Sequence, residues 1–478
     1  MTFTITHAEQ EILSRQESLN PRWYPRYHLA ARCGWINDPN GLVWFKGWYH
    51  AFYQYHPYST QWGPMHWGHA RSRDLVHWEH LPVALAPEGP EDKDGCFSGS
   101  AVVDGETLAL IYTGHKFHGD PDNEENLYQV QCLATSQDGI HFERQGIVLD
   151  TPPGLHHFRD PKVWREGEYW YMVVGARVGD RGEVRLYHSA DDLRQWQEQG
   201  VLDEAGEGMG FMWECPDFFS LDEKRVLMFS PQGMAAKGYQ NRNLFQSGCL
   251  VGDWQPGKPF VRTAAFAEMD GGHDFYAPQS FLTPDGRRMV IGWLDMWESP
   301  LPEQQDGWAG MLSLPRELRL GEDQRLEMRP AKELEALRSV WRSWSGGTLK
   351  NQQITVDEHG EAVEVMLSWD RTRSHAERYG LSLGDGLRIY VDDQMQRLVL
   401  ERHYPQHGLC GTRSVALADR ATLDLRIFID RSSVEVFVND GEACLSSRIY
   451  PDDDRRELSL FAWNGTAEFT DSGLWQLK

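Results

Sequence analysis

We begin with the stretch Trp35-Ile36-Asn37-Asp38-Pro39-Asn40-Gly41, which reads WINDPNG. Asn and Asp beside Pro39, closed by Gly41, are typical of a tight turn. The apolar run Leu42 to Phe45 that follows predicts a buried strand. We therefore expect Asp38 on a rigid turn at a strand entrance, where its carboxylate is aimed in one direction. The alternative is an Asx turn in which Asp38 only caps its own backbone, and the rest of the chain decides between the two.

Two patterns recur along the following 300 residues. In the first, a polar or glycine start leads into an aromatic, β-rich run, at residues 47–53, 106–112, 168–174, 224–229 and 287–293. In the second, S-x-D precedes an aromatic residue and an apolar pair, at residues 72–85, 136–149 and 189–202. About five units of several short strands fit between residues 30 and 325. This repetition predicts a five-bladed β-propeller rather than a sandwich or a helical solenoid.

The remaining segments suggest a second domain. Residues 1–25 are predicted to form an N-terminal arm with a helix near residues 7–18, and residues 26–330 the propeller. Residues 331–346 resemble a connector, helix-like over 331–344. Residues 347–478 alternate in strand fashion at 362–367, 387–391, 398–402, 423–429 and 434–438, the last two joined by a hairpin at residues 430–433, which predicts a β-sandwich. No catalytic cluster is visible in the sandwich, so we expect packing there and leave a homo-oligomer open.

Composition excludes several classes of partner. The chain has 47 basic and 71 acidic residues, a net charge of −24, which argues against nucleic acid and anionic membranes. Its 20 tryptophans offer flat apolar faces with a polar N–H, which suit sugar rings as well as cores. No apolar run reaches membrane-spanning length, and the N-terminus has no signal-peptide pattern.

The seven cysteines are scattered, odd in number and without a C-x-x-C pair. They fit neither a disulfide framework nor a zinc site, so we expect a reducing, cytoplasmic location. Cys96 and Cys215 are interpreted as small buried hydrophobes. His66 and His69 lack the usual partners of a metal site, and no metal or cofactor is implied.

Two more acids occur in equivalent places of the repeat. Asp160 in Phe158-Arg159-Asp160-Pro161 opens the third unit, and Glu214 in Trp213-Glu214-Cys215-Pro216-Asp217 opens the fourth. Taken singly, each acid is weak evidence for a functional site, because Arg159 and Asp160 could form a surface ion pair worth under about 1 kcal/mol. Radial symmetry, however, would bring Asp38, Asp160 and Glu214 to one funnel floor, and clustered carboxylates repel unless they serve a purpose.

Glycosidic bond cleavage is the chemistry that needs such a pair. One ionised carboxylate attacks or stabilises an oxocarbenium-like centre, while a protonated one donates to the leaving oxygen. Arg159 should help keep one acid of the cluster ionised. Glu214, beside Trp213 and near other acids, is the best candidate for the group that holds a proton.

Four motifs, in order, carry a resemblance to a known family: WINDPNG, FSGS at Phe97 to Ser100, RDP at Arg159 to Pro161, and ECPD at Glu214 to Asp217. The chain closely resembles glycoside hydrolase family 32, which contains invertases, sucrose-6-phosphate hydrolases, inulinases and levanases. The likeness covers nearly the whole chain, including FIDRSSVEVFVNDG at residues 428–441. The family fold, a five-bladed propeller followed by a β-sandwich, agrees with the repeat.

The resemblance implies roles for individual residues. Asp38 looks like the nucleophile, Glu214 like the acid/base, and Asp160 like the carboxylate that binds sugar hydroxyls and stabilises the transition state. The positions that match those holding the fructosyl unit are Asn37, Gln54, Trp62, Phe97, Ser98 and Arg159, with Trp293 as an addition. Ile36 stands where Met is usual, an apolar swap of similar volume that should change little.

The resemblance thus implies a retaining β-fructofuranosidase that hydrolyses sucrose through a covalent fructosyl-enzyme. Family members acting on phosphorylated sucrose tend to carry a basic residue near the tract Gln61 to Trp67, which here has no Lys or Arg. This favours unphosphorylated sucrose. Sucrose-6-phosphate hydrolysis, fructan hydrolysis and transfructosylation stay open as alternatives. A non-catalytic sugar-binding propeller is disfavoured, because binding alone needs no proton donor.

Overall fold

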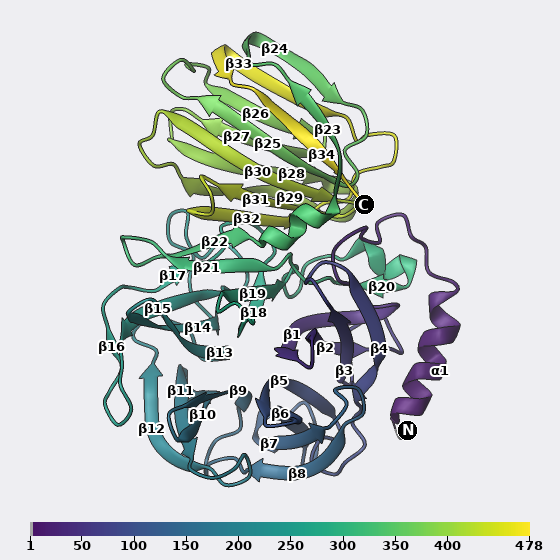
Figure 1. The fold of residues 1–478 in the computed structure, drawn as a ribbon, viewed down its shortest axis with the longest axis vertical. Coiled ribbons are helices and arrows are strands. Elements are labelled where there is room, and N and C mark those ends of the chain that lie inside the picture. The colour runs from purple at the N-terminus through teal and green to yellow at the C-terminus, as the bar shows by residue number, and fades with distance from the viewer. Residues whose placement is uncertain (1–2) are drawn as a thin grey trace.

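Five antiparallel sheets stand in a ring in the computed structural model, which describes residues 3–478 (Figure 1). The predicted five-bladed propeller is confirmed. In chain order the blades are β1 Gly34–Phe45, β2 Trp48–His56, β3 His66–Ser72 and β4 Trp78–Leu85; β5 Gly95–Asp104, β6 Thr107–Phe117, β7 Leu127–Ser136 and β8 Glu143–Leu149; β9 Phe158–Glu166, β10 Tyr169–Val178, β11 Arg181–Ser189 and β12 Gln197–Glu204; β13 Met212–Leu221, β14 Lys224–Gln232, β15 Gly248–Asp253, β16 Val261–Arg262 and β17 Ala267–Glu268; β18 Tyr276–Leu282, β19 Arg288–Trp293, β21 Arg316–Leu320 and β22 Leu326–Pro330.

The recurring sequence patterns occupy equivalent places in the blades. Each aromatic run is a second strand, namely β2, β6, β10, β14 or β19, and the central residues of these strands are buried because neighbouring blades cover both faces. The S-x-D pattern makes the turn between third and fourth strands. In the first blade, Asp74 accepts the backbone N–H groups of Val76 and His77 at 3.1 and 2.9 Å. The pattern is thus a local turn motif that aligns the outer strand.

The ring is closed by a segment from beyond the fifth blade's second strand. Residues Trp308–Ala309 form β20, which pairs in parallel with Gly34 and Trp35 of β1. The backbone N–H of Gly34 also donates to the Gly307 carbonyl at 2.9 Å. The first blade therefore takes a strand from the end of the propeller, which joins the first and last blades and fixes the strand that carries Asp38.

The upper part of Figure 1, coloured green to yellow, is the sandwich, one continuous twelve-stranded sheet folded on itself. Its predicted strands are present, and Asp430 and Ser433 form the predicted hairpin. A role for this domain in oligomerisation stays a prediction. Its strands are β23 Arg338–Trp344, β24 Gly347–Asp357, β25 Val363–Asp370, β26 Arg378–Leu383, β27 Leu387–Asp392, β28 Arg397–Tyr404, β29 Leu409–Ala416, β30 Thr422–Asp430, β31 Ser433–Val438, β32 Ala443–Arg448, β33 Leu458–Phe469 and β34 Ser472–Leu477.

Two segments differ from their sequence interpretation. The helix α1 runs from Ile5 to Gln16, slightly earlier than predicted, because Thr4 caps it by accepting the His7 N–H. The stretch 331–344 is helical only as a short 3-10 turn, Lys332–Leu337, and continues as strand β23. That strand pairs with β34 at the chain end, where Trp341 faces Trp475 with ring centroids 5.1 Å apart. A partner so distant in sequence leaves no local signal.

Buried ion pairs fix the sandwich against the last blade. His28, from the segment before the first blade, contacts Asp430 at 2.8 Å and Glu435 at 2.6 Å. Arg316 of β21 bridges Asp270 at 2.9 Å and Glu435 at 2.7 Å, with no exposed surface. Removing one partner of such a group leaves an uncompensated buried charge, so the two domains are held in one arrangement.

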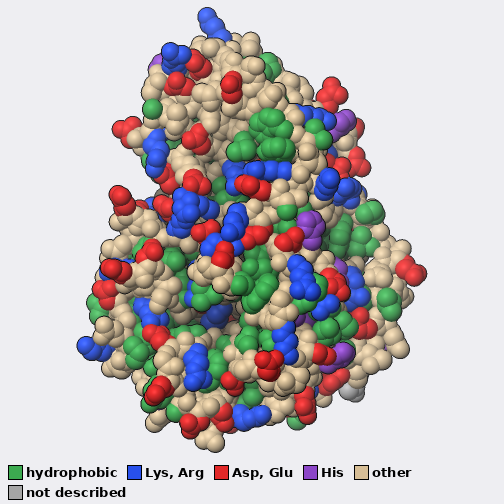
Figure 2. Space-filling model, in the orientation of Figure 1, with side chains coloured by type: hydrophobic (Ala, Val, Ile, Leu, Met, Phe, Trp, Pro, Cys, Tyr) green, Lys and Arg blue, Asp and Glu red, His purple; other side chains and the backbone are tan. Residues whose placement is uncertain are grey.

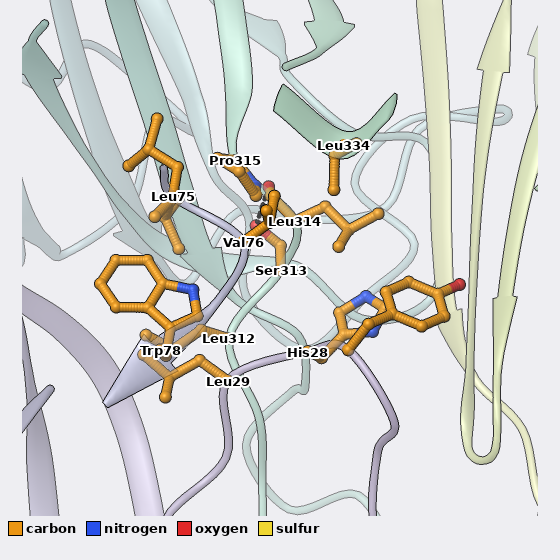
Figure 3. Close-up of a pocket in the computed structure, with 12 residues that line it drawn as sticks. His28, Leu29, Leu75, Val76, Trp78, Leu312, Ser313, Leu314, Pro315 and Leu334 are labelled. Atoms are coloured by element: carbon orange, nitrogen blue, oxygen red, sulfur yellow. Dashed lines mark hydrogen bonds between the residues drawn. The ribbon is translucent and has the colours of Figure 1, made fainter. Parts of the chain in front are cut away.

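A small interior cavity lies where the first blade meets the segment Leu312 to Pro315 (Figure 3). Leu75, Trp78 and Leu334 line it, with His28 at one end, and it has room for about one water molecule. Because its walls are largely apolar and contain no acid, it is a packing defect and not a reaction site. Among residues 3–478, no helix is long and apolar enough to cross a membrane.

Candidate active site

All five inner strands, β1, β5, β9, β13 and β18, carry a bulge at the same level of the ring. In four of them a proline sits at the bulge, at Pro39, Pro161, Pro216 and Pro278. Proline has no N–H for the strand ladder and is found in sheets at such irregularities. A bulge bends its strand and re-aims the side chain beside it. The prolines of the sequence motifs therefore mark where side chains turn toward the propeller axis.

The bulges place residues in left-handed backbone conformations. Asp160, Cys215 and Ala277 have φ of 70°, 48° and 51°. Such conformations are unfavourable for residues other than glycine and persist only where the surroundings enforce them. Here each backbone N–H is bound by the preceding blade: that of Asp160 by Thr113 Oγ1 at 2.9 Å, and that of Ala277 by Ser230 Oγ at 3.1 Å.

The three acids converge as the repeat predicted, and Cys215 links two of them. Its backbone N–H donates to Asp160 Oδ2 at 2.9 Å, and its thiol lies 3.4 Å from Asp38 Oδ2 and 3.6 Å from Asp160 Oδ2. Burial, then the charges of Asp160 and Asp38, raise the pKa of the Cys215 thiol well above its ordinary value. The buried thiol thus stays protonated and acts as a spacer between carboxylates, as a small buried hydrophobe would.

Asp38 is 9% exposed, and its carboxylate is contacted by Ser98, Asn37 and the Cys215 thiol. Ser98 donates its hydroxyl to Oδ2 at 2.6 Å, and Asn37 donates its amide to Oδ1 at 3.1 Å. Trp35 orients Asn37 in turn, since its indole N–H donates to the Asn37 amide oxygen at 2.9 Å. Burial, then the charge of Glu214, raise the pKa of Asp38, while these hydrogen bonds oppose the rise.

Asp160 is 5% exposed and lies on the same floor. Burial raises the pKa of Asp160 from the ordinary 3.8 to about 7; the charges of Glu214 and Asp38 add to the rise and Arg159 opposes it. Like charges confined in a region of low polarity favour retention of a proton. The cluster therefore holds a proton near neutral pH.

Glu214 is the acid with the most donors. Arg159 donates Nε and a terminal nitrogen to Oε1 at 3.1 and 2.8 Å. Gln232 and the Tyr276 hydroxyl donate to Oε2 at 3.0 and 2.5 Å. Arg159 was expected to act on an acid of the cluster, and it contacts Glu214 of the next blade rather than its neighbour Asp160. The expectation that Glu214 carries the reactive proton stays a prediction.

The other predicted sugar contacts divide into two groups. Trp62 is 46% exposed and meets Phe97 edge-on at 6.0 Å, and Phe97 stacks on His115 at 3.8 Å, so an aromatic wall reaches solvent. Gln54 is buried and donates to the Asn40 side chain and the Cys96 carbonyl. Trp293 has no exposed surface and packs behind Trp35 at 5.9 Å, so this geometry offers it no direct sugar contact.

Sequence reasoning missed Tyr276, Gln232 and Thr113. Tyr276 precedes Ala277-Pro278, so the X-Pro bulge of the fifth blade could have revealed it. Gln232 ends β14 and Thr113 lies within β6, positions without a local signal. Their contacts with Glu214 and Asp160 cross between strands or blades and depend on the closed ring.

Across residues 3–478, no group of three or more His, Cys, Asp and Glu side chains is arranged to hold a metal ion. His66 and His69, considered as a metal pair from the sequence, have separate partners. His66 Nδ1 contacts the Pro64 carbonyl at 2.9 Å, and His69 Nε2 contacts His50 Nδ1 at 2.9 Å.

Comparison with known proteins identifies relatives over the whole length. The profile of the Glycosyl hydrolases family 32 N-terminal domain matches residues 28–330, and that of the family 32 C-terminal domain matches residues 333–476. The chain is 54% identical to the sucrose-6-phosphate hydrolase of Escherichia coli over 100% of both chains. It is 55% identical to the raffinose invertase of the same species over 95% of each.

Solved structures agree with these relatives. The β-fructofuranosidase BmSUC1 of Bombyx mori has a TM-score of 0.87 at 36% identity, over 99% of this chain and 98% of that one. A variant of that enzyme was solved in complex with sucrose. The sucrose-6-phosphate hydrolase of Lactobacillus gasseri has a TM-score of 0.85 at 27% identity, over 100% of this chain and 99% of that one.

Proposed function

This chain belongs to glycosyl hydrolases family 32, and from that membership and the geometry of its acids we propose that it hydrolyses the fructosyl bond of sucrose to glucose and fructose. The observation that carries the proposal is the meeting of Asp38, Asp160 and Glu214 on one buried floor beneath an exposed aromatic wall. A site that only bound sugar would have no use for three mutually repelling acids.

The reaction follows from how each acid is held. Asp38, fixed by Ser98 and Asn37, attacks the anomeric carbon of the fructosyl unit and forms an ester as the bond to the glucosyl oxygen breaks. Glu214 gives its proton to that oxygen, and glucose leaves. Glu214 then takes a proton from water, the water attacks the anomeric carbon, and fructose is released with Asp38 restored.

Asp160 acts on the sugar rather than on the bond being broken. Its Oδ2 is fixed by the Cys215 N–H, and Thr113 holds its backbone. The carboxyl group can thus bind hydroxyls of the fructosyl ring and, when ionised, stabilise the positive charge that develops at the anomeric carbon. Two displacements at that carbon retain its configuration, for which the carboxyl groups of Asp38 and Glu214 should lie about 5–5.5 Å apart.

Sucrose-6-phosphate is the second candidate substrate. Relatives of nearly equal identity carry the names sucrose-6-phosphate hydrolase and raffinose invertase, so relatedness does not choose between phosphorylated and neutral sugars. The tract Gln61 to Trp67 near the aromatic wall has no Lys or Arg, which favours sucrose. We also place the enzyme in the cytoplasm, because all seven cysteines are free thiols, which suits a reducing compartment.

The test compares Asp38→Asn and Glu214→Gln with Asp180→Asn, whose carboxylate is 97% exposed on the surface. We expect each active-site variant to lower kcat on sucrose at least about a thousandfold, because each removes an essential group. Asp180→Asn should keep wild-type activity, and circular dichroism should show that all three fold. Near-normal turnover by Asp38→Asn or Glu214→Gln would contradict the proposed roles, and turnover of neither sucrose nor sucrose-6-phosphate by wild-type enzyme would contradict the substrate class.

A further inference from the structure

A second hollow lies where the propeller meets the sandwich, a boundary along which Figure 2 shows Lys and Arg side chains gathered with acids. The loop between β14 and β15 lines it with Arg242 and Asn243, and the β28–β29 hairpin lines it with Arg402, Cys410 and Arg413. We call it the arginine pocket. Its volume is about 310 Å³, roughly ten times the 30 Å³ that a water molecule occupies in the liquid.

Two of its arginines have no acidic partner. Arg413 donates to the Asn243 side chain at 2.8 Å and to the carbonyls of Thr412 and Arg242, all neutral acceptors. Arg242 donates to the Gly238 carbonyl at 2.6 Å. Neither has a carboxylate oxygen within 4.0 Å among residues 3–478. An arginine has five N–H donors in a planar fork, so several donors remain for a ligand.

The floor of the pocket is also positive. Arg402 is 6% exposed and pairs with Asp274 at 2.7 Å, but its Nε has no hydrogen-bond partner among residues 3–478. The exposed Glu298 is the acid on the rim. Three guanidinium groups therefore face the carboxylates of Asp274 and Glu298, and Glu268 also acts on Arg413. Burial, then the charge of Arg402, lower the pKa of Arg413, while the charges of Asp274 and Glu268 partly oppose this change.

A buried imidazole adds a further donor. His273 is 3% exposed, and its Nδ1 lies 2.7 Å from the Ser447 hydroxyl, while Nε2 makes no hydrogen bond of good geometry within the described part of the chain. Burial, then Arg402 and Arg413, hold the pKa of His273 well below its ordinary value, so the ring is neutral. In the tautomer in which the Ser447 hydroxyl donates to Nδ1, the ring proton sits on Nε2, where a ligand would share it with the Gly411 carbonyl.

Two stacked tryptophans connect the arginine pocket with the active site. Trp297 lines the pocket and stacks on Trp35, with ring centroids 6.0 Å and planes 26° apart. Trp35 in turn orients Asn37 beside Asp38. The pocket is therefore linked to Asp38 through Trp297, Trp35 and Asn37.

We propose that the arginine pocket binds a phosphate monoester dianion. The remaining N–H groups of Arg242 and Arg413 can bind phosphate oxygens, and the His273 N–H supplies a neutral donor. The net charge of −24 does not prevent this, because charges beyond about 8 Å are largely screened at physiological salt. The dianion can belong to a phosphorylated disaccharide bound at the active site, a source that rests on the proposed function, or to a free sugar phosphate.

Cys410 provides a local probe, since it is the exposed cysteine of the seven and lines the pocket. Its rate of modification by a neutral maleimide at pH 7.5 is measured with glucose 6-phosphate, inorganic phosphate or glucose. We expect both phosphate-bearing compounds to slow labelling several-fold and glucose to leave it unchanged. The double variant Arg242→Gln/Arg413→Gln should lose this protection, while Arg455→Gln, 61% exposed on the sandwich, should keep it.

Equal labelling rates with glucose and the phosphate compounds in wild-type protein would overturn the proposal, as would protection that survives in the double variant. Steady-state kinetics then identify the source. If the phosphorylated disaccharide reaches the pocket, Arg413→Gln lowers kcat/KM for sucrose-6-phosphate by about tenfold or more and that for sucrose less than about twofold. If only free sugar phosphates bind, both values stay while Cys410 protection is lost. Protection without turnover of either sugar would refute the proposed function and leave the pocket standing.

Discussion

Replacing Asp160 with Asn should change how stability depends on pH. In the folded chain, burial and the neighbouring acids raise the pKa of Asp160 from 3.8 to about 7, so the unfolded chain ionises this group first. Between pH 5 and pH 7 the unfolded state has lost the proton that the folded state still holds. Stability from this group is therefore present at low pH and lost as pH rises.

The magnitude follows from the width of that window. Each pKa unit corresponds to 1.36 kcal/mol, and Asp160 is half ionised at pH 7 in the folded chain, so the free energy of unfolding falls by about 2 kcal/mol between pH 5 and pH 7 through this group. Asn cannot ionise, and it tolerates the left-handed backbone that Asp160 adopts at φ 70°. The free energy of unfolding of the variant should thus fall by about 2 kcal/mol less than that of wild type between pH 5 and pH 7, although the variant cannot support catalysis.

Urea unfolding of both proteins at pH 5 and pH 7, followed by the fluorescence of the buried Trp213 and its neighbours, measures the change in the free energy of unfolding with pH. The prediction concerns the difference in this change between the variant and wild type. Comparing the two pH values cancels any constant effect of the amide on packing. Asp180→Asn, the exposed control, should show the wild-type pH dependence. Identical pH dependence in Asp160→Asn and wild type would refute the argument, since it would mean that the cluster does not hold its proton here.

Three further outcomes follow from other contacts. Tyr276→Phe removes the hydroxyl that donates to Glu214 at 2.5 Å, so kcat/KM on sucrose should fall about tenfold with unchanged circular dichroism; an unchanged pH–rate profile and rate would contradict this. Burial lowers the pKa of His28, but hydrogen bonds and ion pairs with Asp430 and Glu435 outweigh it and raise the pKa from 6.5 to about 9, so the stabilisation by His28 is complete below pH 6.5 and is lost as pH rises through 9. His28→Gln should therefore be less stable than wild type by about 3 kcal/mol at pH 6, as a urea midpoint reports, with the gap closing by pH 10. Trp62→Ala should raise KM for sucrose several-fold and leave kcat nearly unchanged, because an exposed ring binds ground and transition states alike; a loss confined to kcat would count against it.

The sequence predicted those features that repeat or that are local. Five similar strand patterns predicted the propeller, and the equivalent places of Asp38, Asp160 and Glu214 predicted that the acids meet. The partner of Arg159 was not predictable, because Glu214 becomes its neighbour only when the third and fourth blades pack. Strand β23 was misread as a helix for the same reason, since its partner lies at the chain end.

The same bulges that direct the acids also make them depend on an intact ring. Backbone groups at the bulges cannot complete the strand ladder, so the preceding blade must satisfy them: Thr113 binds the Asp160 N–H, and Asp160 in turn binds the Cys215 N–H. An acid of this site is therefore both a reacting group and a structural acceptor between blades. That dual role explains how a strained, charged floor persists. The strain of each bulge is offset by a hydrogen bond that exists only when the neighbouring blade is in place. The geometry needed for catalysis therefore depends on the closure of the propeller.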